Sequence, residues 1–141
     1  GGGIPADPAI RDGWFVQPSI FTGVNNMMRV AREEVFGPVL SIIPFDGEED
    51  GFAIANDTPY GLAGGLWTKN MGRALRGAAA IEAGTVWINT YRTVSFMAPF
   101  GGYKRSGIGR ESGQEAVNEF LQTKTVWIDT IGKTGNPFIL Q

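Results

Sequence analysis

The stretch AGGLWTKNMGRALRGAAAIEAGTVWIN, from Ala63 to Asn89, carries the pattern that decides the fold. Its two ends, Ala63 to Thr68 and Thr85 to Asn89, have the composition of short strands. Between them, Gly72 to Ala83 places its aliphatic side chains on one helical face and its arginines on another. Strands joined by a helix with short links pair in parallel through a right-handed crossover. The stretch therefore predicts a strand-helix-strand unit.

The ends of this helix are marked in the sequence. Asn70 is a favourable N-cap residue, because its side-chain oxygen can accept a hydrogen bond from an unpaired backbone N–H of the first turn. Gly84 is placed to end the helix, since glycine readily adopts the backbone conformation found after a helix C-terminus.

The same alternation extends toward the N-terminus. Val39 to Phe45 predicts a strand, and Asp46-Gly47-Glu48-Glu49 has the spacing of a capping box for a short helix that stops at Asn56-Asp57-Thr58-Pro59. Trp14 to Phe21 predicts another strand, which Pro18 places at an edge or a bulge. The predicted fold class is α/β, a three-layer unit in which helices cover a mostly parallel sheet.

The C-terminal part of the chain follows a different pattern. Thr90 to Ile108 has no periodicity and is rich in glycine, proline and aromatic residues, which predicts a long ordered loop. Ser112 to Leu121 predicts a last helix, and Thr123 to Thr130 alternates like an exposed strand that needs a partner. We therefore divide the chain into residues 1–108, the main α/β part, and residues 109–141, which contain this helix, this strand and a frayed tail.

Composition restricts the possible partners and location. The 141 residues are 43% hydrophobic, which is enough for one core, and the net charge of -2 comes without a stripe of Lys and Arg that could bind nucleic acid. No apolar stretch approaches the ~20 residues of a membrane span. The first residues lack the charged and apolar regions of a secretory signal, so a cytoplasmic location is expected.

The chain contains no cysteine and no histidine. This excludes disulfides, a thiol nucleophile and thiolate zinc sites within the 141 residues, and it removes the commonest general base and metal ligand. No metal site is expected. Any chemistry in this chain must depend on carboxylates, basic side chains or backbone groups.

Glu34 is the first candidate for a binding residue. It stands in the segment Glu33-Glu34-Val35-Phe36-Gly37-Pro38. One carboxylate can accept hydrogen bonds from both hydroxyls of a ribose, which would fix a nucleotide. The alternative is that Glu33 and Glu34 form a solvated acidic pair at a helix end, as most acidic residues are exposed.

The loop from Tyr91 to Phe100, which is rich in aromatic residues and is called the aromatic loop below, offers a second group of candidates. Phe100 precedes Gly101-Gly102, and glycines let backbone approach closely while an aromatic ring walls a cleft. Phe96 and Phe100 could equally be core aromatics. Arg92 and Ser95 are unusual in such a loop: a partly desolvated guanidinium would favour a substrate with a distal carboxylate. Arg92 pointing to solvent, or pairing with an acidic neighbour, is the alternative.

Glu111 is the third candidate, in the segment Gly109-Arg110-Glu111. A buried carboxylate can relay protons when its pKa is raised. The alternative role is an acidic residue in a first helical turn, where the helix dipole favours it.

Two segments in this order, Glu33 to Pro38 and Pro99 to Glu111, closely resemble the C-terminal part of the NAD(P)-dependent aldehyde dehydrogenases. The resemblance runs from about Gly1 to Asp129. It implies that residues 1–108 are the C-terminal part of a catalytic domain, and that residues 109–141 hold a bridging helix, an oligomerisation strand and a tail.

The resemblance also implies roles for the candidates. Glu34 matches the family position that holds the nicotinamide ribose, and Phe36 the position that packs near the nicotinamide ring. Phe100 corresponds to a residue that lines the aldehyde entrance, and the variable residues before it, including Arg92, Ser95 and Phe96, set substrate choice. Glu111 corresponds to a carboxylate in a proton relay of hydrolytic members.

The expected function is that of a fragment: part of an enzyme that oxidises an aldehyde to a carboxylic acid with NAD or NADP as cofactor. Because the family nucleophile is a cysteine and this chain has none, the chain alone is expected to be inactive. Its expected partners are a small aldehyde, its own N-terminal portion or a Rossmann domain, and further copies in a dimer or tetramer. A non-catalytic assembly or interaction module derived from the same fold is the alternative.

Overall fold

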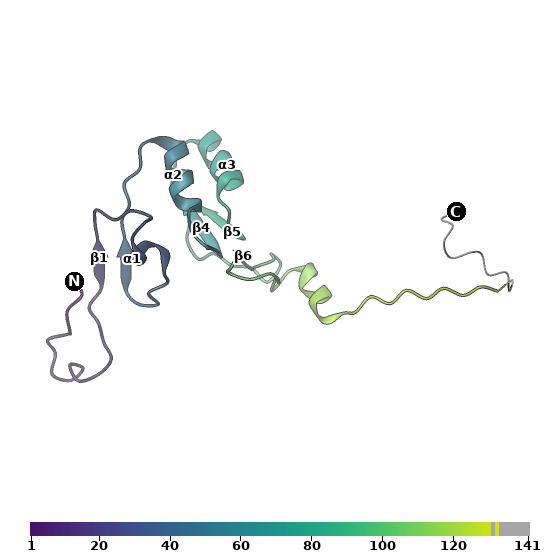
Figure 1. Cartoon of the computed structure of the whole chain (residues 1–141), viewed down its shortest axis with the longest axis horizontal. Helices are drawn as coiled ribbons and strands as arrows, with labels where there is room; N and C mark the ends of the chain where they lie inside the picture. The colour runs from purple at the N-terminus through teal and green to yellow at the C-terminus, as the bar shows by residue number, and fades with distance from the viewer. Residues whose placement is uncertain (131, 133–141) are drawn as a thin grey trace.

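The computed structural model describes residues 1–130 and Gly132. Figure 1 shows a folded body built from the helices and strands, from which the C-terminal part runs out as an extended arm. Helices and strands both contribute to the body, as the α/β prediction requires. The strands form three separate two-stranded sheets, with the orders β1-β2, β3-β6 and β4-β5, rather than one continuous sheet.

The first sheet is formed by β1 (Ser19–Phe21) and β2 (Val39–Ser41), which are parallel with Ser19 opposite Val39. Helix α1 (Arg29–Arg32) lies between them in the chain. Both strands are shorter than the predicted spans of 14–21 and 39–45. Pro18 stands directly before β1 and has no N–H to donate to a neighbouring strand, which accounts for the later start of β1.

Helix α2 (Gly47–Asn56) forms where the acidic segment predicted it. Its N-terminus is capped differently from a capping box: the Asp46 side chain makes no capping bond, and the Asp46 backbone N–H donates to the Asp50 carboxylate at 2.8 Å. The carboxylate that reaches back is one residue later than the spacing predicted. Because Gly47 has a φ of +87°, it shifts the register of the first turn.

The predicted strand-helix-strand unit is confirmed as β4 (Ala63–Leu66), α3 (Met71–Ala80) and β5 (Thr85–Ile88), with β4 and β5 parallel and Ala63 opposite Thr85. The predicted Asn70 cap is also confirmed, since its side-chain oxygen accepts from the Arg73 backbone N–H at 3.0 Å.

The prediction that Gly84 ends the helix is wrong. Helix α3 ends at Ala80, and its C-cap Ile81 has a φ of -74° with extended backbone. Gly84 instead permits a close backbone approach, because a Cβ built on it would lie 1.7 Å from the Gly101 carbonyl oxygen. This contact brings the aromatic loop against the start of β5.

The loop predicted from 90 to 108 is mostly irregular but contains β6 (Tyr103–Lys104), which pairs antiparallel with β3 (Tyr60–Gly61). The helix predicted from 112 to 121 is a 3₁₀ helix, η1 (Gln114–Phe120). Ser112 and Gly113 have φ values of +60° and +65°, which are incompatible with a right-handed helix, so the helix starts after them.

The segment predicted as a strand from 123 to 130 is not in any sheet among the described residues. It forms the arm in Figure 1, and its apolar side chains are exposed, with Trp127 at 92%. The frayed tail predicted beyond Gly132 lies outside the described residues. In residues 1–130 no helix has the length and apolar character to cross a membrane.

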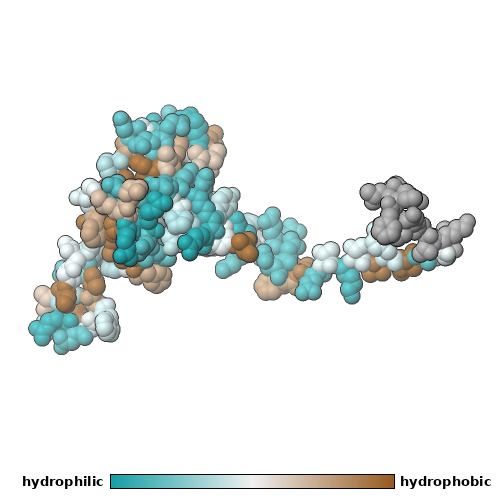
Figure 2. Space-filling model, in the orientation of Figure 1, coloured by the Kyte–Doolittle hydropathy of each residue, from teal (hydrophilic) through white to brown (hydrophobic). Residues whose placement is uncertain are grey.

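The expected single core is not closed within this chain. Among the described residues only Val24 and Ala74 are buried apolar side chains, and no large side chain is fully buried. Figure 2 shows apolar side chains distributed over the visible surface of the body and along the arm. Two-stranded sheets with short strands cannot cover their own faces, so the apolar residues that the composition supplies stay exposed.

Candidate functional site

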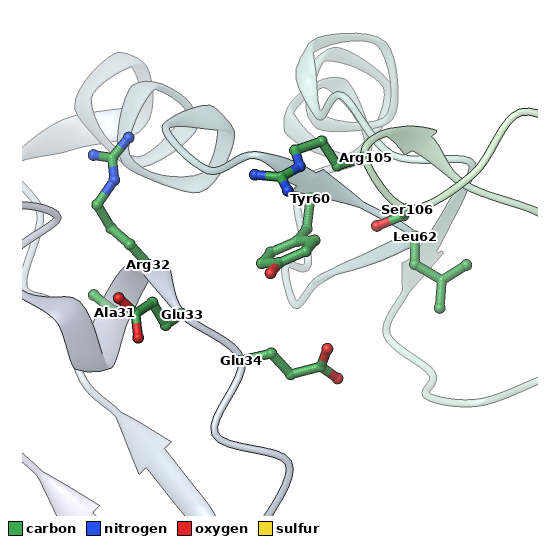
Figure 3. A pocket seen from close by; sticks show the side chains of 8 residues that line it. All are labelled: Ala31, Arg32, Glu33, Glu34, Tyr60, Leu62, Arg105 and Ser106. Atoms are coloured by element: carbon green, nitrogen blue, oxygen red, sulfur yellow. The ribbon is translucent and has the colours of Figure 1, made fainter.

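Glu34 lies on an exposed connection between α1 and β2, at the edge of two hollows. The first hollow, of about 490 Å³, is shown in Figure 3. It is lined by Ala31, Arg32, Glu33, Glu34, Tyr60, Leu62, Arg105 and Ser106. The second, of about 710 Å³, shares Ala31, Glu33 and Glu34 with the first and also includes Phe36, Tyr91 and Arg92.

The two adjacent glutamates differ in their partners. Both carboxylate oxygens of Glu33 accept from the Arg29 guanidinium, at 2.8 and 2.7 Å, and these hydrogen bonds hold the pKa of Glu33 below its ordinary value. The Glu34 carboxylate has no hydrogen bond or ion pair with any described residue. Glu33 thus fits the solvated alternative, whereas both oxygens of Glu34 are available to a ligand.

The side chain of Phe36 is exposed to solvent. Its φ of +52° lies in the left-handed region that is costly for an aromatic residue, and its side chain is 93% exposed. Strain of this kind persists where the surrounding structure or a function requires it. The next residues, Gly37 and Pro38, lead straight into β2, whose pairing fixes the end of the turn.

Arg92 shares the second hollow with Glu34 and Phe36. Its guanidinium lies 5.7 Å from the centre of the Tyr91 ring, and Tyr91 in turn meets Trp87 edge to face at 5.6 Å. Arg92 also has a positive φ, of +58°. The structure therefore brings Arg92, from the aromatic loop, next to Glu34 and Phe36, which stand in a separate segment of the sequence.

Phe100 and Glu111 are also brought together, through their backbones. The N–H of each donates to the carbonyl of the other at 2.7 Å, forming an antiparallel bridge. Both line a third hollow of about 550 Å³. Phe100 is half-buried and Glu111 is exposed, so this chain does not supply the burial that a proton relay would need around Glu111.

Leu62 and Ser106 line both the first and the third hollow, which makes these two hollows neighbours. Ser95 and Phe96 line neither of them, nor the second. The Ser95 hydroxyl accepts from the Met97 N–H at 3.2 Å in a local turn, and the exposed Phe96 contributes its carbonyl to the Gly113 N–H at 2.9 Å. The structure thus does not join them to the other candidates.

Sequence reasoning missed several residues of the first hollow: Arg32, Tyr60, Leu62, Arg105 and Ser106. The Ser106 hydroxyl accepts from the Gly61 backbone N–H at 3.0 Å, which links the turn after β6 to β3. The signal for Arg32 was its position directly before the two glutamates. Nothing local in the sequence indicates Tyr60, since 26 positions separate it from Glu34 and only the tertiary fold makes them neighbours.

Arg110 is structural in this chain. It donates to the Gly102 carbonyl at 3.0 Å and lies 5.5 Å from the centre of the Tyr103 ring. Among the described residues no group of three or more carboxylates could hold a metal ion.

Comparison with known proteins places this geometry in context. The sequence model of the Aldehyde dehydrogenase family matches residues 1–126. A betaine aldehyde dehydrogenase of Mesorhizobium japonicum is 46% identical over 138 residues, which are 98% of this chain and 28% of that protein. An aldehyde dehydrogenase of Enchytraeus buchholzi is 52% identical over 118 residues, or 84% of this chain and 24% of that protein.

Solved structures give the same picture. A betaine aldehyde dehydrogenase from Staphylococcus aureus, in complex with NAD+, superposes with a TM-score of 0.87 at 42% identity, over 95% of this chain and 27% of that one. An indole-3-acetaldehyde dehydrogenase from P. syringae, also with NAD+, has a TM-score of 0.77 at 51% identity, over 81% of this chain and 23% of that one. The chain spans about a quarter of the length of these relatives.

Proposed function

This chain belongs to the aldehyde dehydrogenase family, and from that membership we propose that it forms the nicotinamide-side and pocket-side part of an enzyme that oxidises an aldehyde to a carboxylic acid. The cofactor is NAD+ or NADP+, in agreement with the relatives solved with NAD+. When bound, the nicotinamide would accept the hydride from the substrate carbon.

One observation supports this assignment most directly: the Glu34 carboxylate has no partner among the described residues and borders two hollows, with the exposed Phe36 ring beside one of them. Two free carboxylate oxygens suit the two hydroxyls of a ribose. An exposed aromatic ring next to them can pack against a planar heterocycle. Glu34 would therefore hold the sugar while Phe36 limits the positions of the attached ring.

The covalent step requires groups that the 141 residues do not contain. A thiolate adds to the aldehyde carbon, and after hydride transfer the resulting thioester is hydrolysed by water, which releases the acid and the thiol. We assign the thiol and the general base to parts of the enzyme outside this chain, as the chain has no cysteine or histidine. A Rossmann domain elsewhere in the enzyme would bind the rest of the dinucleotide.

We assign the aldehyde pocket wall to Phe100 in the third hollow and to Arg92 in the second. Ser95 and Phe96 would join this wall only if neighbouring parts of the enzyme fold over them. Glu111 would serve as a proton relay on the same condition, because its carboxylate is exposed in this chain.

The charge of Arg92 bears on the substrate. Several relatives are named betaine aldehyde dehydrogenases, and their aldehyde carries a quaternary ammonium. A guanidinium in the pocket would repel such a cation and attract a carboxylate. We therefore propose an aldehyde with a remote acid group as the preferred substrate.

A non-catalytic assembly module is the second candidate, because the chain lacks a cysteine and carries an extended arm that belongs to no sheet among the described residues. Under either function, we propose that the segment from 122 to 130 pairs with the sheet edge of a neighbouring subunit.

The Glu34→Gln variant of the full-length enzyme tests the enzymatic function. A neutral amide holds the ribose less firmly, so the pre-steady-state burst of NADH should slow by about tenfold or more while the aldehyde KM changes little. Glu33→Gln is the matched control, because Glu33 is occupied by Arg29. An unchanged burst rate in Glu34→Gln would place Glu34 on a solvated surface and contradict the proposal.

A further inference from the structure

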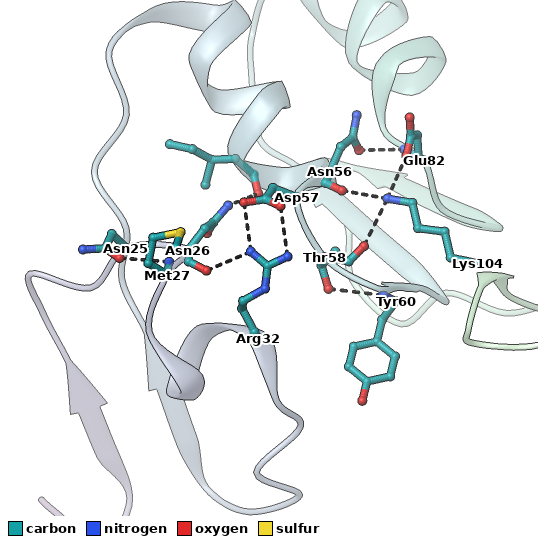
Figure 4. A network of polar contacts seen from close by, with 11 residues as sticks. Asn25, Asn26, Met27, Arg32, Asn56, Asp57, Thr58, Tyr60, Glu82 and Lys104 are labelled. Carbon is teal, nitrogen blue, oxygen red and sulfur yellow. Dashed lines mark hydrogen bonds and ion pairs between the residues drawn. The ribbon is translucent and has the colours of Figure 1, made fainter.

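Arg32 connects the Glu34 segment to the end of α2, as the network in Figure 4 shows. Its guanidinium donates to the two carboxylate oxygens of Asp57 at 3.2 and 3.3 Å, and to the Asn26 carbonyl at 3.0 Å. A planar guanidinium that makes two contacts with one carboxylate fixes direction as well as distance.

Asp57 is itself held in a fixed place. Its backbone N–H donates to the Ala53 carbonyl at 3.0 Å, which closes the last turn of α2. Asn26 provides a parallel tie, since its side-chain amide donates to the Ile54 carbonyl at 3.0 Å. The contacts of Arg32 therefore fix the position of the Glu34 segment relative to the end of α2, a regular helix of ten residues.

The same turn is anchored on its other side. The Asn56 side chain donates to the Ala80 carbonyl at 2.7 Å and accepts from the Glu82 N–H at 2.9 Å. Lys104 donates to the Asn56 carbonyl at 2.7 Å and pairs with the Glu82 carboxylate at 2.7 Å. Asp57 thus sits on a turn joined to both α3 and β6.

Apolar packing does not fix α1 in this way. The helix has four residues, none of them buried, and Glu33 pairs back along the helix with Arg29. On the side of β2, one weak contact from the Ser41 hydroxyl to the Val30 carbonyl at 3.3 Å holds it. On the side of the first hollow, α1 is attached to the rest of the body through the hydrogen bonds of Arg32.

We propose that Arg32 and Asp57 form a positioning pair that sets the direction in which the Glu34 carboxylate meets the cofactor ribose. This inference rests on the function proposed above. Arg32 is the last residue of α1, and a single extended residue, Glu33, separates it from Glu34. In Figure 3 the two side chains leave the segment in different directions, so Arg32 can hold the backbone while Glu34 stays free for the ligand.

The test uses the full-length enzyme with Arg32→Ala, Arg32→Lys and Asp57→Asn. Small displacements of a positioning group cost one to two orders of magnitude in rate, so Arg32→Ala and Asp57→Asn should each slow the NADH burst by about tenfold. The aldehyde KM, the melting temperature and the oligomer mass should stay close to those of the parent. Arg32→Lys should recover part of the rate, because lysine keeps the charge without the two-point contact.

Arg29→Ala is the matched control, because Arg29 lies on the same helix and its side chain is hydrogen-bonded to Glu33 alone among the described residues. It should leave the burst rate within about twofold of the parent, as expected for an exposed helical ion pair. A burst as slow as that of Arg32→Ala would show that any loss of charge on α1 has this effect, and would overturn the specific pair.

Combination with Glu34→Gln shows whether the pair acts through Glu34. Adding Arg32→Ala to Glu34→Gln should cause no further loss in burst rate. A further tenfold loss, or a parental rate in both Arg32→Ala and Asp57→Asn, overturns the positioning pair alone. A silent Glu34→Gln overturns the proposed function and the pair together. If Arg32→Ala does not assemble, Asp57→Asn decides, since it keeps the shape of the side chain.

Discussion

Under the proposed function, Arg92 is the residue whose charge would bear most directly on substrate choice. It lines the same hollow as Glu34 and lies over the Tyr91 ring. An arginine on an aromatic platform keeps its charge and loses little freedom when it binds a carboxylate.

We predict that Arg92→Ala changes selectivity rather than overall rate. The ratio of kcat/KM for a semialdehyde to that for its uncharged analogue of equal length should fall by about tenfold, the scale of one exposed charge-assisted contact. Betaine aldehyde, a cation, should become a better substrate. Arg92→Lys keeps the charge and should retain most of the ratio. A ratio that does not move in Arg92→Ala would remove this residue from the pocket.

Of the local predictions for helix ends, the Asn70 cap is confirmed, whereas the Gly84 helix end and the capping box at Asp46 are wrong. The Asn70 cap needs only its own side chain and an N–H three residues later, so its spacing was sufficient to predict it. The availability of Glu34 was not predictable in this way, since only the structure shows that Arg29 pairs with Glu33 and not with Glu34.

At the scale of elements, α2 and α3 are linked by ion pairs between Glu48 and two arginines. Glu48 accepts from Arg73 at 2.9 Å and from Arg76 at 2.5 and 3.0 Å, and these hydrogen bonds, those of Arg76 first, lower the pKa of Glu48 to about 2. In the unfolded chain the same carboxyl should titrate near its ordinary value of 4.5. Its contribution to stability is therefore complete above pH 4.5 and is lost as the pH falls toward about 2.

We predict that Glu48→Gln lowers the Tm of the enzyme at neutral pH, and that the difference from the parent shrinks as the pH falls below 4.5. Thermal unfolding of both proteins from pH 7.5 downward measures this. Glu49→Gln is the control, because Glu49 forms no ion pair with a described residue. A Glu48→Gln difference that stays constant at low pH would show that the effect does not come from the ionised carboxylate.

At the scale of the whole molecule, this chain exposes far more surface than a compact protein of its mass. A compact protein of 15.2 kDa exposes about 7,100 Å², whereas this chain exposes 11972 Å². Large apolar side chains such as Trp14 and Trp127 are fully exposed. The chain therefore needs other protein surface to cover it, which agrees with relatives more than three times its length.

We predict that the arm is an assembly element. Deleting the residues after Leu121 in the full-length enzyme should reduce the mass measured by light scattering, because the exposed Val126, Trp127 and Ile128 would lose their partner subunit. A chain that ends at Gly132 keeps the arm and should assemble normally. An undiminished mass after the longer deletion would mean that other surfaces hold the subunits together.

The sequence by itself determined the β4-α3-β5 unit, because its pattern is local, and the family, because two segments of characteristic sequence occur in the family's order. Only the tertiary structure decided which parts of those segments meet. The left-handed backbone at Ser112 and Gly113 moves the start of the last helix to Gln114, and Arg32 pairs with Asp57, 25 positions further along the chain. Pairing over such distances follows from the packing of whole elements, and neighbouring residues alone do not encode it. The arm is another example. Its alternating sequence favours a strand, but a strand forms only where the edge of another strand or sheet is available for pairing.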